Sequence, residues 1–468
     1  MAGVLLHGLA RLALTAFLYL RSPYSLDYGE GCVLAMVQLL DERGTYFVSL
    51  ADYPFVQFNY PPVFPGVVWP FYHCLGPSLF VPRLISLMAT AGTLAIMYRL
   101  TRRLAGSRAV AMGLTGIALC PWFVQTWAPL ARVDMLAIFF SLAGLLAFSE
   151  GMPLWAAFGL FWLGVFTKQN ALLAPAAVLL VLLLSTPWRR GAAAAAGFLV
   201  PLAILFTVLV VTTQGEAYRH LITYTMAAGF DSTRIGAAYH DLTRVAWPLF
   251  LVIGVGLVRR PRALAQGPGA LPLLYGLLSL AGLVSVAKIG AVQNYFIEPW
   301  LATIVAASAA LGPATERPAA ALRLPALLLA AAVALYTNDW AHDPPHAIAH
   351  PDEDAAFRRL RAVVHETDGP ILSENLAVLV LDRKPVLVEP FGFLILSRAH
   401  LLRTRPVVRD CEARLFRVVV LEGLLERVPS LRECLEARYR VVEDLPPYRL
   451  LRPDASRPLP SADRPATR

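Results

Sequence analysis

Apolar runs long enough to cross a lipid bilayer recur through the first 336 residues of this 468-residue chain. A helix needs about 20 mainly apolar residues to span the hydrocarbon core, with a tolerance of several residues. Because a backbone in lipid must satisfy its own hydrogen bonds, these runs predict helices. We expect about eleven, near Ala2–Leu20, Phe80–Leu100, Ala109–Phe123, Met135–Ser149, Pro153–Phe166, Leu172–Leu184, Gly191–Val211, Val245–Val258, Leu271–Ala287, Pro299–Leu311 and Ala319–Leu335.

The composition places most of the chain in lipid. Hydrophobic residues make up 57% of it, charged residues only 16%, and the mean hydropathy is +0.58. From Asn338 onward, 20 Lys and Arg balance 20 Asp and Glu, so the whole net charge of +9 belongs to the preceding part. Basic residues beside apolar runs normally report topology. We therefore predict a mainly α, multi-pass membrane bundle and no nucleic-acid partner.

The positions of the arginines predict the orientation of the bundle. They follow the second, sixth, eighth and tenth runs: Arg99, Arg102, Arg103, Arg108, Arg189, Arg190, Arg259, Arg260, Arg262, Arg317 and Arg323. Basic residues are retained in cytoplasmic loops. These even-numbered exits predict a cytoplasmic amino terminus and an extracytoplasmic carboxyl-terminal region in an inner, or plasma, membrane.

The chain divides into three predicted parts. Residues 1–337 form the transmembrane part, including a long first outside loop over residues 21–78. Residues 338–451 alternate helical and β-rich patterns, which indicates a small extracytoplasmic α/β domain. Its expected elements are helices at Asp352–Glu366 and Leu431–Arg438 and strands at Pro370–Ser373, Pro385–Val388, Arg417–Leu421, Tyr439–Glu443 and Tyr448–Leu451. The polar tail, residues 452–468, is expected to be disordered.

The five cysteines indicate neither a zinc site nor a redox motif, because no C-x-x-C spacing is present. In an oxidising compartment, Cys32 could pair with Cys74, or Cys411 with Cys434. Free thiols are the alternative.

Two acids directly follow the first apolar run. In a helix that begins near Asp27, a spacing of three would place Asp27 and Glu30 on one face. Two carboxylates at a membrane surface suit deprotonation of an acceptor hydroxyl or binding of a divalent ion. The alternative is structural: Asp27 would cap the helix, and Glu30 would stabilise its first turn.

At this point the chain resembles the GT-C superfamily of polyprenyl-phosphate-sugar-dependent glycosyltransferases, which includes protein O-mannosyltransferases and lipid A aminoarabinose transferases. The resemblance covers about the first 340 residues and includes the long first outside loop and its Tyr60-Pro61-Pro62 element. It implies that an acid after the first helix acts as base or metal contact. Asp27 occupies that place, and Glu30 is the second candidate. Many members have adjacent Asp and Glu, whereas Tyr28 and Gly29 separate the acids here.

Cations on the outer side could neutralise a lipid phosphate. Lys168 is the most informative, because a lone Lys at an outer helix end opposes the charge trend; the alternative is snorkelling to headgroups. Arg132 is a second candidate, although it could simply pair with Asp134. Arg219 is a third candidate, and Arg234 and Lys288 are also predicted on the extracytoplasmic side.

Uncharged polar groups near the outer rim suit contacts with a sugar or an acceptor. Gln293 and Asn294 follow the ninth run, Gln169 follows Lys168, and Tyr60 lies in the first outside loop. Polar groups are costly in so apolar a chain unless they are used or paired.

The combined pattern predicts a glycosyltransferase that moves a sugar from a polyprenyl phosphate to an acceptor hydroxyl of a glycan, lipid or protein. A single displacement would invert the configuration of the anomeric carbon. A divalent metal is the one candidate cofactor. Membrane lipids would surround the chain. Nucleotide-binding, zinc-protease and serine-hydrolase motifs are absent from the sequence. The alternatives are a transporter or flippase of lipid-linked saccharides and a scaffold whose outer domain recruits partners. No clear repeat supports the transporter.

Overall fold

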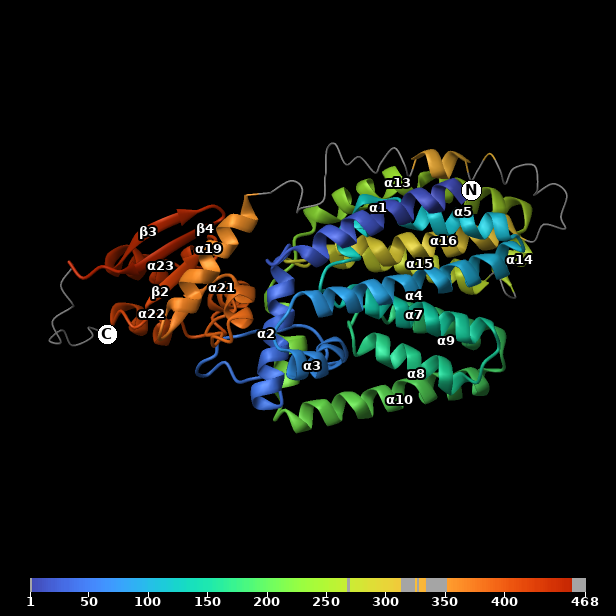
Figure 1. Ribbon diagram of the computed structural model, residues 1–468. Helices are drawn as coiled ribbons and strands as arrows, with labels where there is room; N and C mark the ends of the chain where they lie inside the picture. Colours follow the sequence, from blue (N-terminus) through green and yellow to red (C-terminus); the bar gives the residue numbers. More distant parts are fainter. Residues whose placement is uncertain (1, 267–269, 313–324, 326–327, 334–351, 457–468) are drawn as a thin grey trace.

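A bundle of apolar helices carries a small domain with a β-sheet at one end (Figure 1). The computed structural model describes residues 2–266, 270–312, 325, 328–333 and 352–456. The predicted fold class, a mainly helical membrane bundle followed by a small α/β domain, is confirmed. The boundary predicted at residues 337 and 338 lies outside the described residues.

Helices of the bundle coincide with ten of the predicted apolar runs. They are α1 (Ala2–Arg21), α4 (Phe80–Ala105), α5 (Arg108–Leu119), α6 (Trp122–Trp127), α7 (Asp134–Ser149), α8 (Leu154–Val165), α9 (Leu173–Ser185), α10 (Trp188–Thr212), α13 (Thr233–Arg259), α15 (Ala270–Gly282) with the 3-10 helix η3 (Leu283–Ala287), and α16 (Ile297–Leu311). Most of the eleventh run, Ala319–Leu335, lies outside the described residues.

Length and composition support membrane crossing for much of this bundle. Five helical segments of the described chain are long and apolar enough to span a membrane: α1, α4, α10, α13 and α15 with η3. Helices α5, α7, α8 and α9 are apolar but shorter. Only 6% of the apolar window of α10 is buried inside the protein, so its side chains are free to face lipid.

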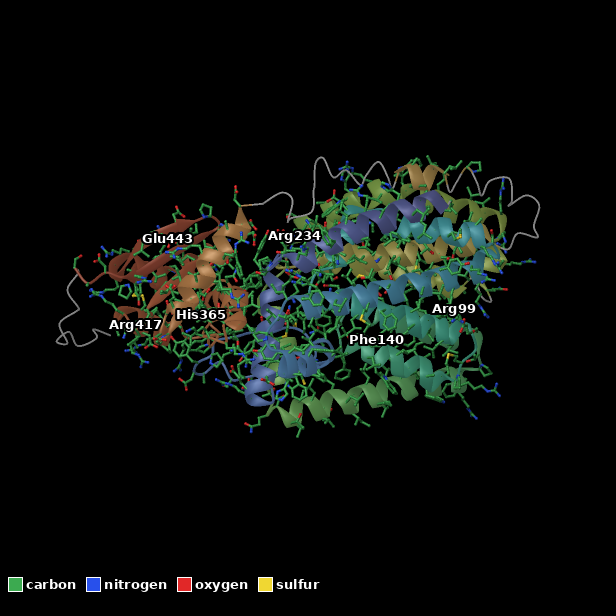
Figure 2. The ribbon with its side chains drawn as sticks, viewed as in Figure 1. Arg99, Phe140, Arg234, His365, Arg417 and Glu443 are labelled. Carbon is green, nitrogen blue, oxygen red and sulfur yellow. A yellow bond between two sulfur atoms is a disulfide. The ribbon has the colours of Figure 1, made fainter. Side chains whose placement is uncertain are left out.

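The two ends of the bundle differ in charge. Figure 2 places Arg99 toward the end remote from the sheet domain and Arg234 at the junction with it. Arg103 in α4 lines a cavity together with Ser149, Ser185 and Gln266, so the chain segments after α4, α7 and α9 meet at this remote end. The arginine clusters after α4, α9 and α13 therefore gather there, whereas Arg317 and Arg323, after the tenth predicted run, lie outside the described residues.

Short helices and loops form the junction between bundle and domain. They are α2 (Tyr28–Arg43), α3 (Val63–Leu75), α11 (Glu216–Tyr218), the π-helix η1 (Arg219–Thr223), α12 (Tyr224–Ala227) and the 3-10 helix η4 (Gln293–Phe296). In Figure 1, α2 lies across the end of the bundle, next to the domain. At the remote end, α14 (Pro261–Ala265) precedes α15.

The carboxyl-terminal domain contains one four-stranded sheet in the order β1-β2-β4-β3. Its strands are β1 (Ile371–Ser373), β2 (Val418–Leu421), β3 (Tyr439–Leu445) and β4 (Tyr448–Pro453). Strands β1 and β2 are parallel, and β4 pairs antiparallel with both β2 and β3. The accompanying helices are α19 (Glu353–Glu366), α20 (Leu376–Leu381), α21 (Pro390–Arg398), α22 (Arg405–Glu412), the 3-10 helix η5 (Leu425–Arg427) and α23 (Pro429–Arg438).

Two details of this domain differ from the predictions. The strand predicted at Pro385–Val388 is wrong: Val388 forms only an isolated parallel bridge to Phe55 in the first outside loop, so this segment docks the domain instead of extending its sheet. Strand β4 continues to Pro453, because Arg452 and Pro453 still pair with β3. The domain thus continues past residue 451, and residues 457–468 of the predicted tail lie outside the described ones.

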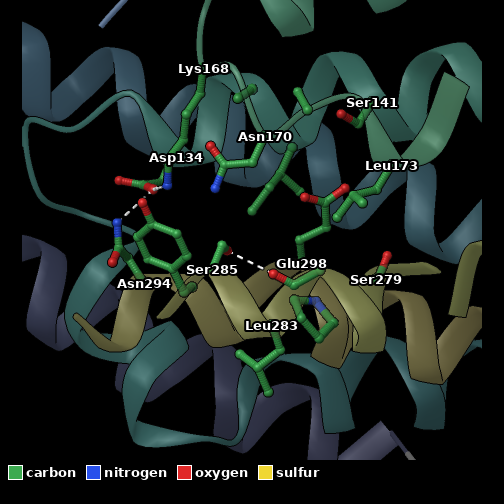
Figure 3. Close-up of a pocket in the computed structure, with 16 residues that line it drawn as sticks. Asp134, Ser141, Lys168, Asn170, Leu173, Ser279, Leu283, Ser285, Asn294 and Glu298 are labelled. Atoms are coloured by element: carbon green, nitrogen blue, oxygen red, sulfur yellow. Dashed lines mark hydrogen bonds and ion pairs between the residues drawn. The ribbon is translucent and has the colours of Figure 1, made fainter. Parts of the chain in front are cut away.

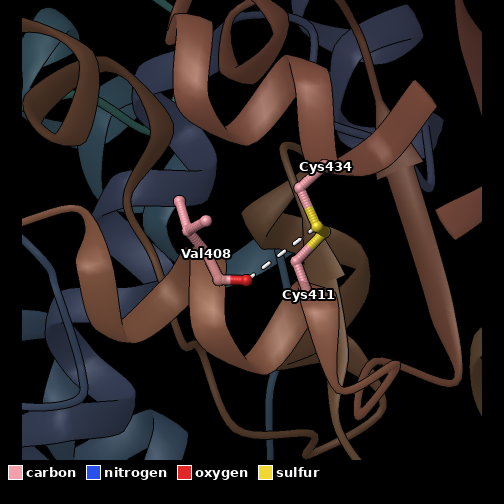
Figure 4. The surroundings of a disulfide bond; sticks show 3 residues. All are labelled: Val408, Cys411 and Cys434. Carbon is pink, nitrogen blue, oxygen red and sulfur yellow. Dashed lines mark hydrogen bonds between the residues drawn. A yellow bond between two sulfur atoms is a disulfide. The ribbon is translucent and has the colours of Figure 1, made fainter. Parts of the chain in front are cut away.

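A disulfide between Cys411 and Cys434 joins α22 to α23 (Figure 4). It is one of the two pairings that the sequence left open. Cys32 and Cys74 are free thiols.

Candidate active site

Asp27 is the N-cap of α2. Its Oδ2 accepts a hydrogen bond from Gly29 N at 2.8 Å and another from Arg132 Nη1 at 2.6 Å. The close approach of Arg132 requires glycine at position 29, because a Cβ there would lie 1.5 Å from Arg132 Nη1. Within the described chain, Oδ1 of Asp27 has no hydrogen-bond partner, and the side chain is 20% exposed.

Glu30 faces a different partner. Its carboxylate is fully buried against Arg83 of α4, with Arg83 Nε 2.8 Å from Oε1 and Arg83 Nη2 2.7 Å from Oε2. It also accepts from Leu26 N and Ala131 N, both at 2.8 Å. Asp27 and Glu30 therefore do not form a carboxylate pair, because each is held by a different arginine.

Arg132 lies between two aromatic rings and donates to a tyrosine. Its Nη2 is 2.8 Å from Tyr60 Oη. The guanidinium carbon is 5.7 Å from the Tyr60 ring centroid and 5.5 Å from that of Trp127. These contacts hold the guanidinium in one orientation, where little of the side chain is exposed to solvent.

Lys168 pairs with Asp134 at the start of α7. Its Nζ is 2.5 Å from Asp134 Oδ1 and 4.4 Å from the Tyr295 ring centroid. Asn294 donates to the same Oδ1 at 2.8 Å. Arg132 Nε lies 3.7 Å from Oδ2 of Asp134, so Asp134 connects the two cations. Figure 3 shows Asp134, Lys168 and Asn294 converging from three separate elements.

Two cavities meet at Asn294 and Tyr295, which line both. The first, the junction cavity, has an empty volume of about 840 Å³ that includes open solvent. Its wall contains Arg132, Tyr60, Lys288, Tyr28 and residues of the carboxyl-terminal domain. The second, the bundle cavity, has an empty volume of about 470 Å³ and extends from Asp134 and Lys168 between the helices (Figure 3).

The carboxyl-terminal domain supplies part of the junction cavity's wall. Glu389 caps α21, accepts from Phe391 N and Gly392 N, and is hydrogen-bonded by Tyr28 Oη. The ring of Phe391 packs against Gly290, which has a positive φ of 90° and no room for a Cβ. Burial raises the pKa of Glu389 to about 7. The domain and the end of the bundle therefore share one cavity.

Five of the nine predicted site residues come together in this region: Asp27, Arg132, Tyr60, Lys168 and Asn294. Four of these five line a cavity, whereas Asp27 lines neither and contacts the wall through Arg132. The remaining four predicted residues also line neither cavity. Glu30 is enclosed by its pairing with Arg83, Arg219 is exposed and pairs with Glu216, Gln293 is exposed, and the Gln169 side chain donates to Asn59 O.

Other residues of the site did not stand out in the sequence. Asp134 was considered only as a salt-bridge partner of Arg132. Glu389 and Phe391 both contact Tyr28, from which they are 361 and 363 positions away in the sequence. Nothing in the local sequence around them signals this approach to the bundle. Asn170 and Ser141 line the bundle cavity, yet a single small polar residue in an apolar run carries little information about its neighbours.

The side chains at the site do not form a metal-ligand set. Asp27 and Asp134 face protein cations, and no group of three or more His, Cys, Asp or Glu side chains able to hold a metal occurs among the described residues.

No family model and no curated protein matches this sequence. Among solved structures, ArnT from Cupriavidus metallidurans in the apo state matches with a TM-score of 0.63 and 14% identity, covering 97% of this chain and 98% of that one. The same protein bound to undecaprenyl phosphate matches with a TM-score of 0.60 and 15% identity, covering 97% and 99%. The chain has the ArnT fold. The architecture expected from the sequence, a polytopic helix bundle followed by a small α/β domain, is thereby confirmed, and identity this low establishes the fold alone.

Removing the charge of Glu30 is expected to destabilise the protein. Glu30→Gln leaves Arg83 buried without its counter-charge, which typically costs about 3–5 kcal/mol in the free energy of unfolding. Glu150→Gln is the matched control, because its partner Arg99 is 62% exposed and such surface pairs contribute about 0–1 kcal/mol. Denaturant unfolding of both variants in detergent measures the difference. Equal losses would show that the Glu30 pair contributes no more than a surface pair.

Proposed function

We propose that the chain is a membrane glycosyltransferase that moves a sugar from a polyprenyl-phosphate donor to an acceptor hydroxyl on the extracytoplasmic side. The observation that carries this proposal is the pair of buried cations, Arg132 and Lys168, each on a carboxylate beside the two cavities. The ArnT fold, which in one solved structure holds undecaprenyl phosphate, supports a donor of the same lipid class.

The cations would bind the donor phosphate. The side chains of Arg132 and Lys168 are each only 10% exposed, so a phosphate beside them interacts through a medium of lower dielectric constant than water. Lys288 adds a third cation to the junction cavity. Burial, and the nearby charge of Lys168, lower the pKa of Lys288 to about 8. A bound phosphate would stabilise its protonated form.

Asp27 would act as the general base. The acceptor oxygen attacks the anomeric carbon of the donor while its proton passes to the unpartnered Oδ1 of Asp27. The bond between that carbon and the phosphate oxygen breaks, and its electron pair leaves with the polyprenyl phosphate. A single displacement of this kind inverts the anomeric configuration. Glu30 takes no proton in this scheme and holds the start of α2 in place.

The acceptor, whether glycan, lipid or protein, would enter through the junction cavity. This cavity lies between the bundle and the carboxyl-terminal domain, and residues of both line it. Tyr60 and Asn294 present polar groups there, and Phe391 an apolar ring. The domain would thus help to bind the acceptor and cover the reaction.

We further propose that the sheet domain lies outside the cytoplasm of a bacterial-type inner membrane. The arginine-rich end of the bundle is opposite the domain, and the Cys411–Cys434 disulfide suits an oxidising compartment.

Reporter fusions test this orientation. A reporter that is active only outside the cytoplasm should be active when fused after Asp343 and silent when fused after Arg260. The reverse pattern would place the site on the cytoplasmic side and contradict the orientation.

Replacing Asp27 by Asn tests the chemistry. Asn is as good an N-cap as Asp and keeps an oxygen for Gly29 N and Arg132, so the fold should survive while the base is lost. We expect turnover to fall about 10²- to 10⁴-fold. The measurement is release of undecaprenyl phosphate from a panel of labelled undecaprenyl-phosphate sugars, with envelope extract as the source of acceptors.

The matched control is Asp41→Asn at the far end of the same helix, where the carboxylate contacts Trp69 and His73 away from both cavities. Its turnover should remain near the wild-type value. Wild-type turnover in a normally expressed Asp27→Asn variant would reduce Asp27 to a helix cap.

A further inference from the structure

The bundle cavity has polar atoms that lack partners. Successive turns of α7 line one wall with Asp134, Ala137, Ile138 and Ser141, a spacing that puts all four on one helix face. Opposite them lie Ser279 of α15 and Glu298 of α16, with Asn170 at the start of the α9 segment (Figure 3).

Four side-chain oxygens of the residues that line this cavity have no hydrogen bond within the described structure. They are Asp134 Oδ2, Asn294 Oδ1, Ser141 Oγ and Ser279 Oγ, and the four residues are 2%, 4%, 1% and 0% exposed. A buried polar atom left unsatisfied costs about 1–3 kcal/mol. Asp134 Oδ2 lies 3.7 Å from Arg132 Nε and so faces a cation of the protein. The other three oxygens have no partner within the described structure, and a ligand that carries hydroxyls would supply one.

The other lining groups narrow the class of ligand. The amide of Asn170 and the carboxyl of Glu298 add polar contacts, whereas Leu173, Leu283 and Pro299 close the remaining wall with apolar surface. Glu298 accepts a hydrogen bond from Tyr275 Oη at 3.2 Å, so its position is fixed. A few fixed polar groups on an apolar background match a small molecule that carries several hydroxyls. A polyisoprenoid tail has no polar group and would leave the unpartnered oxygens of this cavity unsatisfied.

The bundle cavity adjoins the proposed site of the donor phosphate. Lys168 lies at its mouth, and Asn294 and Tyr295 separate it from the junction cavity that holds Arg132. A group attached to a lipid phosphate beside Lys168 would therefore be able to reach into the bundle cavity. The acceptor would approach the same point from the junction cavity.

We propose that the bundle cavity is the subsite for the sugar of the donor, an assignment that rests on the proposed function. Hydroxyls of a single sugar ring donate to Asn294 Oδ1 and exchange hydrogen bonds with Ser141 and Ser279. The subsite selects a monosaccharide by the positions of these hydroxyls. Ser141 and Asn170 are then specificity residues that lie apart from the base.

A comparison of two lipids tests this subsite. The probes are undecaprenyl phosphate and whichever of its glucosyl, mannosyl and arabinosyl derivatives the wild type binds most tightly. Ser141→Leu fills the cavity and should weaken binding of the glycosylated lipid by about 10-fold or more, the loss of one good hydrogen bond. Binding of undecaprenyl phosphate should stay within about twofold, because the phosphate contacts remain. Ser149→Leu on the same helix, at the remote end, is the control and should change neither.

The possible results separate the subsite from the proposed function. Should Ser141→Leu fail to fold, Ser141→Ala removes the hydroxyl without adding bulk and should show the same selective loss at smaller size. Equal weakening of both lipids, or no change in either, would overturn the sugar subsite while transfer by the wild type still upheld the glycosyltransferase. A wild type that binds none of these lipids would overturn both.

Discussion

The buried pair of Arg83 and Glu30 holds together the segments on which the candidate site depends. Arg83 donates to the carbonyls of Tyr19, Ser22 and Tyr24 at the end of α1, and Glu30 accepts from Ala131 beside Arg132. One ion pair thereby fixes the exit of α1, the start of α2, the first turn of α4 and the segment that carries Arg132. Because both side chains are fully buried, neither charge can be removed alone without a large cost.

The cost of burying an unpaired charge also applies to Arg132 and Lys168. Arg132 rests on Asp27 and Lys168 on Asp134, so each charge is compensated before any ligand arrives. A phosphate entering between the two cations would compete with those carboxylates for the same hydrogen bonds. In our account this competition loosens Asp27 from Arg132 as the donor binds.

The sequence predicted the large features of the structure because they follow from local rules. Ten of the eleven predicted apolar runs coincide with helices of the described chain, and the arginines marked one end of the bundle. Asp27, Arg132 and Lys168 stood out because charges are rare in so apolar a chain. The helical spacing rule failed for Glu30, because the buried Arg83 holds its carboxylate inside the protein while Arg132 holds that of Asp27. Glu389 and the bundle cavity could not be predicted, since both arise from contacts between segments distant in the sequence.

A structure of the protein with bound undecaprenyl phosphate, determined by cryo-electron microscopy, tests the central claim most directly. The account predicts the phosphate within hydrogen-bonding distance of both Arg132 and Lys168, with its tail leaving toward lipid. The opposite end of the bundle offers a clear contrast, because Arg103 lines a largely apolar cavity there. A phosphate bound beside Arg103, with Arg132 and Lys168 still on their carboxylates, would contradict the proposed site.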